Sequence, residues 1–213
     1  MSKFIVLEGI DGSGKTTQMK YIDEFLSAQN IKHICTREPG GIKISEDIRR
    51  IVLDKDNTTM DNKTEALLYA ASRRQHLVKK IIPAIKEDYH VICDRFVYSS
   101  LVYQGYARGI GIEEVFNINN FAIENKIPDL TIFIDVDVKI ALRRMQRRKD
   151  KDMDRLDLEN ADFHKRTLEG YEIVMEKYKW NIIKVDGNLE QINVFKQIKN
   201  SLIKELNIKE GES

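Results

Sequence analysis

This sequence contains few cysteines, little net charge and no long apolar run, and each absence narrows what the protein can be. Cysteine occurs only twice among 213 residues, at Cys35 and Cys93. Both lie inside expected strands, so we expect reduced core residues. The formal net charge is +1, so no overall field favours nucleic acid or a membrane surface as a partner. Any basic site must therefore be built locally.

Targeting and anchoring segments are missing as well. No apolar run approaches the length of a membrane span. The first expected strand begins almost at the N-terminus, which leaves no room for a signal peptide. We therefore expect a cytoplasmic protein with no membrane partner. No internal repeat or linker is present, and the length suits one α/β domain over residues 1–208, followed by a frayed tail at 209–213.

The sequence does contain a phosphate-binding loop, EGIDGSGKT, at residues 8–16, with the spacing G-x-x-x-x-G-K-[ST]. Its glycines let backbone N–H groups approach phosphate oxygens, and the following helix points the positive end of its dipole at the same anion. An apolar strand before the loop and a helix after it favour this function over a chance glycine-rich turn. We expect a nucleoside triphosphate to bind Gly9, Asp11, Gly12, Ser13, Gly14, Lys15, Thr16 and Thr17.

Five apolar segments alternate with helical patterns, which predicts a parallel sheet with helices on both faces. The expected strands are 4–7, 31–36, 89–93, 130–136 and 180–185. The expected helices are 18–28, one capped by Ser45, 63–86 with Pro83 kinking or ending it, 112–124, one starting at 138, 161–177 and one ending near 206. The buried stripe of helix 63–86 should contain Leu67, Ala70, Ala71, Leu77, Val78 and Ile81. Residues 96–109 are assigned no helix or strand.

Charged residues follow successive strands at the edge of this sheet where ligands of such folds bind. Arg37 follows the second strand, and Asp94 and Arg95 follow the third. Asp94 suits a Mg²⁺ ligand, although capping of the next helix is an alternative that the phosphate loop makes less attractive. Each arginine alone could form a surface ion pair. Two arginines at one edge favour binding of a second phosphate, that of an acceptor.

A basic stretch lies between positions 143 and 155. It consists of Arg143, Arg144, Arg147, Arg148, Lys149, Lys151 and Arg155, interleaved with three aspartates. One interpretation is a solvated helix face with many ion pairs. The other is a mobile lid, over about 143–157, that closes over the donor and brings arginines to the charge developing on the transferred phosphoryl group.

Together, the segments FIVLEGIDGSGKTTQ, TREPGG, ALLYAASRRQH, DRFVYSSLVYQGYARG and DRLD resemble the thymidylate kinase family of P-loop nucleoside monophosphate kinases. The matched segments span residues 4–157, and the combination is far more specific than the phosphate loop alone. The resemblance implies a three-layer P-loop fold with a five-stranded parallel sheet and a mobile lid. It also implies transfer of the γ-phosphoryl group of ATP to dTMP, giving dTDP for dTTP biosynthesis, with Mg²⁺ and in a homodimer.

The resemblance further implies roles for individual residues. From the acceptor phosphate to the base, dTMP would contact Arg37, Arg49 and Arg95, then Asp11 and Tyr103 at the sugar, then Tyr69, Arg73, Ser100 and Gln104. The residues themselves support the base pocket, because Tyr69 and Arg73 are four positions apart and share a helix face.

The expected catalytic groups are Lys15, Asp94, Arg95, Arg148 and Arg155, with Thr16 and Asp94 as Mg²⁺ ligands. One branch of the family has an arginine inside the phosphate loop, where this chain has Gly12 and Ser13. The lid would then supply that charge. Arg147 is a close alternative to the two lid arginines named.

Other hypotheses stay open at this point. Ile42, Tyr69 and Asp157 stand where threonine, phenylalanine and glutamate are usual in the family, which leaves fine specificity undecided. A deoxynucleoside kinase or another nucleoside monophosphate kinase is the alternative enzyme. A regulatory P-loop NTPase is a third hypothesis, but the guanine-specific N-K-x-D pattern is only approached at residues 125–128, where proline takes the fourth place.

Overall fold

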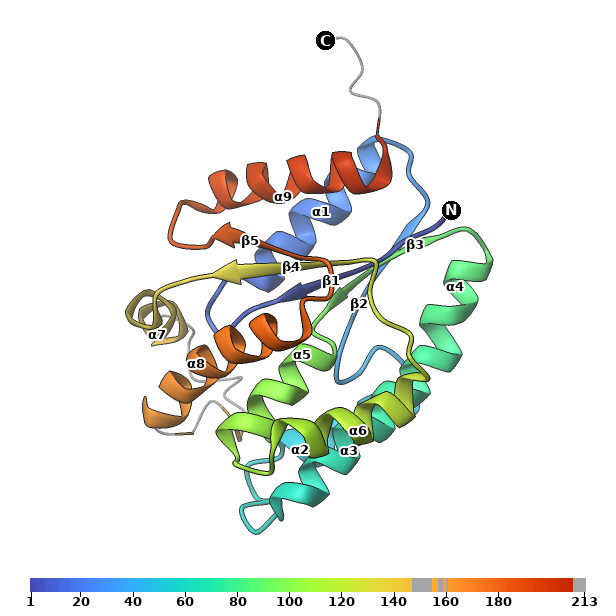
Figure 1. The fold of residues 1–213 in the computed structure, drawn as a ribbon. Coiled ribbons are helices and arrows are strands. Elements are labelled where there is room, and N and C mark those ends of the chain that lie inside the picture. The colour runs from blue at the N-terminus through green and yellow to red at the C-terminus, as the bar shows by residue number, and fades with distance from the viewer. Residues whose placement is uncertain (147–154, 157–158, 160, 209–213) are drawn as a thin grey trace.

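A computed structural model describes residues 1–146, 155–156, 159 and 161–208, and it contains a five-stranded sheet between layers of helices (Figure 1). The strands are β1 (Phe4–Glu8), β2 (His33–Arg37), β3 (His90–Asp94), β4 (Leu130–Asp135) and β5 (Ile182–Asp186). The α-helices are α1 (Lys15–Ala28), α2 (Lys43–Leu53), α3 (Asn62–His76), α4 (Ile82–Lys86), α5 (Val97–Ser100), α6 (Ile112–Ile123), α7 (Val138–Gln146), α8 (Ala161–Tyr178) and α9 (Gln191–Leu206). Two π-helical segments, η1 (Leu77–Ile81) and η2 (Leu101–Ala107), follow α3 and α5. None of the helices over the described residues is long and apolar enough to cross a bilayer.

The strands run parallel in the order β2-β3-β1-β4-β5, which confirms the predicted fold class. The central strand, β1, is buried along its whole length, as expected when helices cover both faces. Leu7 of β1 pairs with Asp94 of β3, and Glu8 pairs with Phe133 of β4. The loops that follow β1, β2 and β3 therefore emerge at one edge of the sheet.

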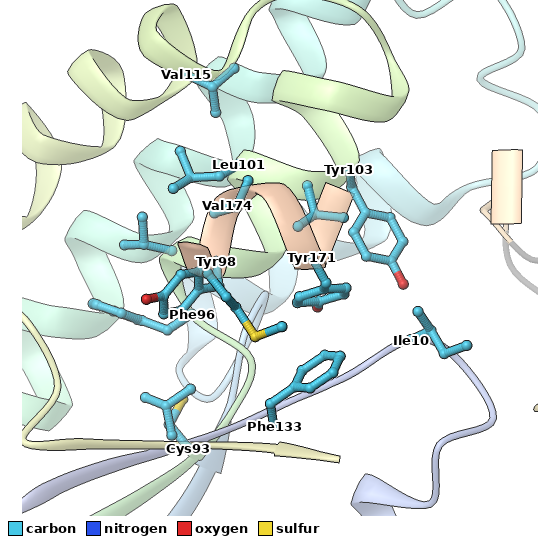
Figure 2. Packing of buried hydrophobic residues seen from close by; sticks show 14 of the residues in the cluster. Ile10, Cys93, Phe96, Tyr98, Leu101, Tyr103, Val115, Phe133, Tyr171 and Val174 are labelled. Carbon is cyan, nitrogen blue, oxygen red and sulfur yellow. The ribbon is translucent and has the colours of Figure 1, made fainter. Parts of the chain in front are cut away.

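Each face of the sheet has its own apolar core. Alternate residues of β1 point to opposite faces, so Phe4 and Val6 join one cluster while Ile5 and Leu7 join the other. The first cluster lies against η2 and α8, and Figure 2 shows Leu101 and Tyr171 reaching it from those segments. The second cluster is covered by α1 and α9, which lie together on the other side of the sheet (Figure 1). The two cores pack on opposite faces of the sheet and so fix the position of the loops that emerge from its edge.

The long helix predicted for residues 63–86 forms, and it continues through Pro83 to Lys86, so the helix does not end at this proline. The chain is α-helical to His76, π-helical over η1, and α-helical again in α4, where Pro83 lies in the first turn. Proline has no N–H to donate to the carbonyl four residues earlier, and the wider π turn precedes it.

Three local predictions are wrong. Residues 97–107, assigned no element, are helical in α5 and η2; Val97 to Gly105 are all buried, so the segment shows no amphipathic period. Ser45 does not cap α2. Ile42 occupies the cap position, and the buried Ser45 hydroxyl instead donates to the Ser72 carbonyl at 2.9 Å.

The predicted buried stripe of α3 is also partly wrong. Leu67 is 56% exposed, and Ala71 is exposed as well. The buried face of α3 instead carries Tyr69, Arg73 and His76. This helix turns polar and aromatic side chains inward, which is unusual unless they line a site.

Candidate active site

The phosphate loop ends at a helix N-terminus that is open to an anion. Gly14 is left-handed, with φ 101°, and occupies the cap position of α1 without any side-chain cap. The first N–H groups of α1 are therefore available to phosphate oxygens. Gly12 packs so closely that a Cβ there would lie 2.4 Å from the Ala141 carbonyl oxygen of α7. A larger residue would push the loop away from α7.

Lys15 is held inside the loop, with only 7% of the residue exposed. Its ammonium donates to the carbonyls of Gly9 at 2.9 Å and Ile10 at 3.0 Å. Burial, and then the charge of Arg95, lower the pKa of Lys15 to about 8. A polyphosphate beside this ammonium would favour its charged form.

Asp94 and Thr16 fit the requirements of a Mg²⁺ site. Oδ1 of Asp94 is buried and has no hydrogen-bond partner among the described residues. Asp94 ends β3 directly beside β1, and the exposed Thr16 lies in the first turn of α1. A buried carboxylate oxygen without a donor is costly on its own, and oxygen ligands of this kind are what Mg²⁺ prefers.

Arg95 connects the phosphate loop to the neighbouring helices. One terminal nitrogen, Nη1, donates to the Gly9 carbonyl at 3.1 Å and to Ser99 Oγ at 3.0 Å. The other, Nη2, donates to Asp11 Oδ1 at 2.5 Å. The guanidinium also lies 5.1 Å from the centre of the Tyr103 ring. Arg95 adopts φ 72°, a strained value for a residue other than glycine, which the surrounding contacts must hold in place.

Asp11 projects from the phosphate loop toward this cluster. Burial alone would raise the pKa of Asp11, but the charges of Arg95 and Lys15 outweigh burial, and the pKa lies well below its usual range. The Tyr103 hydroxyl donates to Asp11 Oδ2 at 2.8 Å. Asp11 is therefore an ionised, oriented acceptor at the boundary between loop and helix.

Glu8 forms hydrogen bonds that hold this cluster in place, and its role was not predicted from the sequence. Its buried carboxylate accepts hydrogen bonds from the Phe96 backbone N–H at 2.9 Å, Ser99 Oγ at 2.7 Å and the Tyr171 hydroxyl at 2.8 Å. Ser99 and Tyr171 in turn accept from Arg95. The available signal was an acidic residue ending an otherwise apolar, fully buried strand.

Arg73 is buried in a second polar network. Its Nε donates to Glu38 Oε2 at 2.7 Å, and its terminal nitrogens donate to Ser100 Oγ and the Phe96 carbonyl, both at 2.9 Å, and to Asn119. Glu38 and Asn119 were not predicted. Glu38 could have been noticed inside TREPGG, whereas Asn119 lies on a different helix and gives no local signal.

Glu65 forms a third buried network, which includes Arg155 from the end of the basic stretch. Its carboxylate is 1% exposed, accepts from Gln104 Nε2 at 2.8 Å, and forms an ion pair with Arg155. Arg155 Nε also donates to the Val52 carbonyl at 3.1 Å. Arg155 thus lies against α2 and α3. Arg148 and the rest of 147–154 lie outside the described residues.

These networks surround one cavity, which we call the inner cavity. It is lined by Asp11, Glu38, Pro39, Arg49, Leu53, Tyr69, Arg73, Arg95, Ser99, Ser100, Tyr103, Gln104 and Leu156. Of the residues predicted to bind dTMP, all except Arg37 line it. Arg37 instead pairs with Glu46 at 2.8 Å, and its side chain is 51% exposed. The other lining residues, Glu38, Pro39, Leu53, Ser99 and Leu156, were not predicted.

A second concavity, which we call the outer groove, lies on the other side of the phosphate loop. It is lined by Gly12, Ser13, Gly14, Thr17, Gln18, Tyr21, Arg144, Leu189, Glu190, Gln191, Ile192 and Val194. Arg144 Nη2 donates to the Gly187 carbonyl at 3.0 Å, and Nη1 donates to the Ser13 carbonyl at 3.5 Å. The segment after β5 was not predicted to take part. The phosphate loop is shared by both concavities. Asp11 of the loop lines the inner cavity, whereas Gly12 and Gly14 of the loop line the outer groove.

Comparison with known proteins agrees with this geometry. The family model described as thymidylate kinase matches residues 7–198. A thymidylate kinase of Clostridium novyi is 55% identical over 199 residues, which cover 93% of this chain and 97% of that protein. One of a Geobacillus species is 50% identical over 193 residues, covering 91% and 92%. The crystal structure of thymidylate kinase from Ehrlichia chaffeensis superposes with a TM-score of 0.73 at 32% identity, covering 94% of this chain and 98% of that one.

Proposed function

This chain belongs to the thymidylate kinase family and is a dTMP kinase that uses ATP, and we propose that the inner cavity binds dTMP while the outer groove binds ATP. The observation that carries this assignment is the position of the phosphate loop between the two concavities. A loop shared in this way brings the γ-phosphate of the donor next to the phosphate of the acceptor.

The donor is held by the loop and the first turn of α1. The N–H groups after Gly14 and the Lys15 ammonium face the β and γ phosphates, and Thr17 and Arg144 line the rest of the groove. Lys15 must exchange its bonds to the loop carbonyls for bonds to phosphate oxygens. The negative charge of the nucleotide favours that exchange, because it stabilises the ammonium.

The acceptor is held by charge at one end of the inner cavity and by polar side chains at the other. Arg95 and Arg49 face its phosphate, and Arg37 joins them by releasing Glu46. Tyr69 stacks on the base, while Arg73, Ser100 and Gln104 meet its edge. Each of these three is buried and already hydrogen-bonded to the protein, so the base meets fixed donors and acceptors.

The sugar lies between these ends. Asp11 accepts the 3′-hydroxyl of the deoxyribose, and Tyr103, held by its hydrogen bond to Asp11, occupies the space that a 2′-hydroxyl would need. This arrangement favours a deoxynucleotide over a ribonucleotide.

Transfer then requires little covalent chemistry from the protein. An oxygen of the acceptor phosphate forms a bond to the γ-phosphorus as the bond from that phosphorus to the β-phosphate oxygen breaks, which releases ADP. Lys15 and Arg95 stabilise the charge that develops on the transferred group, and Arg148 and Arg155 of the lid are the further candidates for that task. Thr16 and Asp94 would hold Mg²⁺, which supplies charge neutralisation on the β and γ phosphates.

The partner of this chain is a second copy, bound through the layer of α2, α3 and α6. α3 packs between α2 and α6, and each of the three exposes a large apolar residue: Ile51 on α2, Leu67 on α3 and Phe121 on α6. Phe121 is 88% exposed. A second molecule that covers these side chains would explain why Leu67 and Ala71 face outward on α3.

Sedimentation of Phe121→Lys tests the dimer. We expect wild type to sediment as a dimer and the variant as a monomer or as a much weaker dimer. Ile173→Lys, which changes an exposed isoleucine on α8, is the matched control and should stay dimeric. A monomeric wild type would contradict this part of the proposal.

A coupled assay of ADP formation with a panel of acceptors tests the activity. We expect the highest kcat/KM with dTMP, a lower one with dUMP and other monophosphates, and none with thymidine. A preference for thymidine would instead indicate a deoxynucleoside kinase. Hydrolysis of ATP that no acceptor stimulates would indicate a regulatory NTPase.

A further inference from the structure

A group of metal-ligating side chains lies away from both concavities. Asp23 on α1, His33 at the start of β2 and Cys35 two residues later each offer a ligand atom, and these atoms lie within 4.8 Å of one another. Side chains two apart on a strand point to the same face, so His33 and Cys35 both face α1. We propose that this group, the α1–β2 cluster, binds a borderline-soft divalent cation such as Zn²⁺.

The hydrogen bonds of His33 prepare one ring nitrogen for a cation. Nδ1 lies 2.8 Å from the Ile31 carbonyl oxygen, which can only accept, so Nδ1 carries the proton. In the neutral ring, Nε2 then presents its lone pair to Asp23 Oδ1, which is 3.0 Å away. Two acceptors facing each other need a positive ion between them, either a proton or a metal. A backbone carbonyl on Nδ1–H is also the usual support of a histidine that ligates metal through Nε2.

Cys35 supplies the soft ligand. Burial, and then the Asp23 carboxylate, raise the pKa of its thiol to about 12, so without a cation the thiol keeps its proton. A bound divalent cation reverses this preference: the S–H bond breaks, a sulfur–metal bond forms, and the proton passes to solvent. Lys80 also acts on the thiol with its positive charge, but its ammonium is bonded to the Gly41 carbonyl at 3.2 Å.

The donor set and its spacing select the kind of metal. Nitrogen, sulfur and carboxylate oxygen together suit Zn²⁺ and similar ions, whereas Mg²⁺ and Ca²⁺ prefer oxygen alone. Bonds of about 2.0–2.3 Å in tetrahedral geometry separate ligand atoms by roughly 3.3–3.8 Å. The Asp23 side chain is 58% exposed and can therefore rotate, which a cation would need to draw the ligand atoms into that range, with water as the fourth ligand.

Position in the fold indicates what the metal would do. His33 is the first residue of β2, an edge strand, so the cluster lies toward the end of the sheet opposite the phosphate loop. A bound ion would join α1 to β2 and stabilise the folded chain without touching either substrate. We therefore expect an effect on stability and little effect on turnover.

Metal binding by the purified full-length chain tests the proposal. The protein is stripped with a chelator, kept in excess Mg²⁺ to occupy the active site, and titrated with Zn²⁺ against a chromophoric competitor. We expect one tight equivalent in wild type and at least a tenfold weaker affinity in Cys35→Ser, His33→Ala and Asp23→Asn. Zn²⁺ should also raise the Tm of wild type but not of these variants. Cys93→Ala and His164→Ala, which remove a thiol and an imidazole elsewhere, should bind like wild type.

Replacement of Zn²⁺ by Co²⁺ gives an independent signal. A thiolate-to-cobalt absorption band should appear in wild type and Cys93→Ala and be absent in Cys35→Ser. If Zn²⁺ affinity is unchanged in Cys35→Ser and Asp23→Asn, or if the cobalt band is missing in wild type, the α1–β2 cluster is not a metal site. Neither result depends on kinase activity.

Discussion

The inner cavity and the outer groove share the phosphate loop but are built differently. Around the inner cavity, charged side chains are bonded to one another, as with the buried pair of Arg73 and Glu38 and the half-buried pair of Arg95 and Asp11. Around the outer groove, the bonds of Arg144 within the described part of the chain go to main-chain carbonyls, and Lys15 bonds mainly to its own loop. On the proposed assignment, the acceptor side is therefore preformed by side chains, whereas the donor side offers main-chain N–H groups and charges that must rearrange.

This difference follows from what each substrate requires. A triphosphate can be held by N–H groups and a helix dipole, which many sequences provide. A particular base and sugar need donors and acceptors at fixed positions, because a buried polar group left without its partner costs about 1–3 kcal/mol. Fixed positions are obtained here by pairing each polar side chain with another buried one.

The largest expected effect is a loss of kcat, and we compare Lys15 of the phosphate loop with Arg95 of the inner cavity. Lys15→Ala and Arg95→Ala should each lower kcat by about 10³-fold or more, because each removes charge from the transferring phosphoryl group. Thermal unfolding should distinguish them. Arg95→Ala leaves the half-buried Asp11 without its main partner and should lower the Tm, whereas Lys15→Ala removes a desolvated ammonium and should not. Similar losses of Tm in both variants would contradict the proposed difference between the inner cavity and the outer groove.

Arg73 tests whether the inner cavity is preformed. Arg73→Ala removes a charged donor and should raise the KM for dTMP about 10–100-fold. It also breaks a buried ion pair, which should lower the free energy of unfolding by about 3–5 kcal/mol. The neighbouring Arg74 forms an exposed pair with Glu124, so Arg74→Ala should change neither quantity appreciably. If Arg73→Ala does not fold, Ser100→Ala should still raise the KM for dTMP with a smaller loss of stability.

Arg155 belongs to the stretch predicted as a lid, and it lies beside the inner cavity. Because it pairs with the buried Glu65, Arg155→Gln alone should raise the KM for dTMP by about tenfold and change kcat less. Neutralising Arg147, Arg148 and Arg155 together should in contrast depress kcat more than dTMP affinity. A large fall in kcat from Arg155→Gln alone would assign that residue to the transferred phosphoryl group, as the sequence predicted.

The smallest expected effect is a proton taken up by Lys15 when ATP binds. The free enzyme has a pKa of about 8 at Lys15, and phosphate charge raises that value, so at pH 8 binding should take up about half a proton. At pH 6.5 the ammonium is already protonated and contributes almost nothing. Calorimetry in buffers of different ionisation enthalpy measures the uptake. Lys15→Arg, which stays charged, is the control, and equal uptake in both proteins would contradict the assignment.

Sequence reasoning was most successful where function depends on residues that follow strands. The phosphate loop, Asp94 and Arg95 occupy predictable positions because parallel strands end at one edge. It missed the carboxylates of Glu8, Glu38 and Glu65, whose partners lie far along the chain: Glu8 bonds to Tyr171, and Glu65 pairs with Arg155. No local pattern reports such a pair. The exposed position of Leu67 on α3 was also missed, because an apolar residue in a helix is normally assigned to the core.

The π-helical segment η2 has a consequence for how this site tolerates changes in chain length. A π turn holds one residue more than an α-helical turn, and η2 carries both Tyr103 and Gln104. Deleting one residue within Leu101–Ala107 would let the wide turn tighten into an ordinary α-helical turn and would move the side chains that the wide turn presents, Tyr103 and Gln104 among them. The core beside the segment would change as well, because Leu101, Val102 and Ala107 are buried in it. The wide turn therefore joins recognition to packing, and a change in chain length at this point should disturb the inner cavity and the core together.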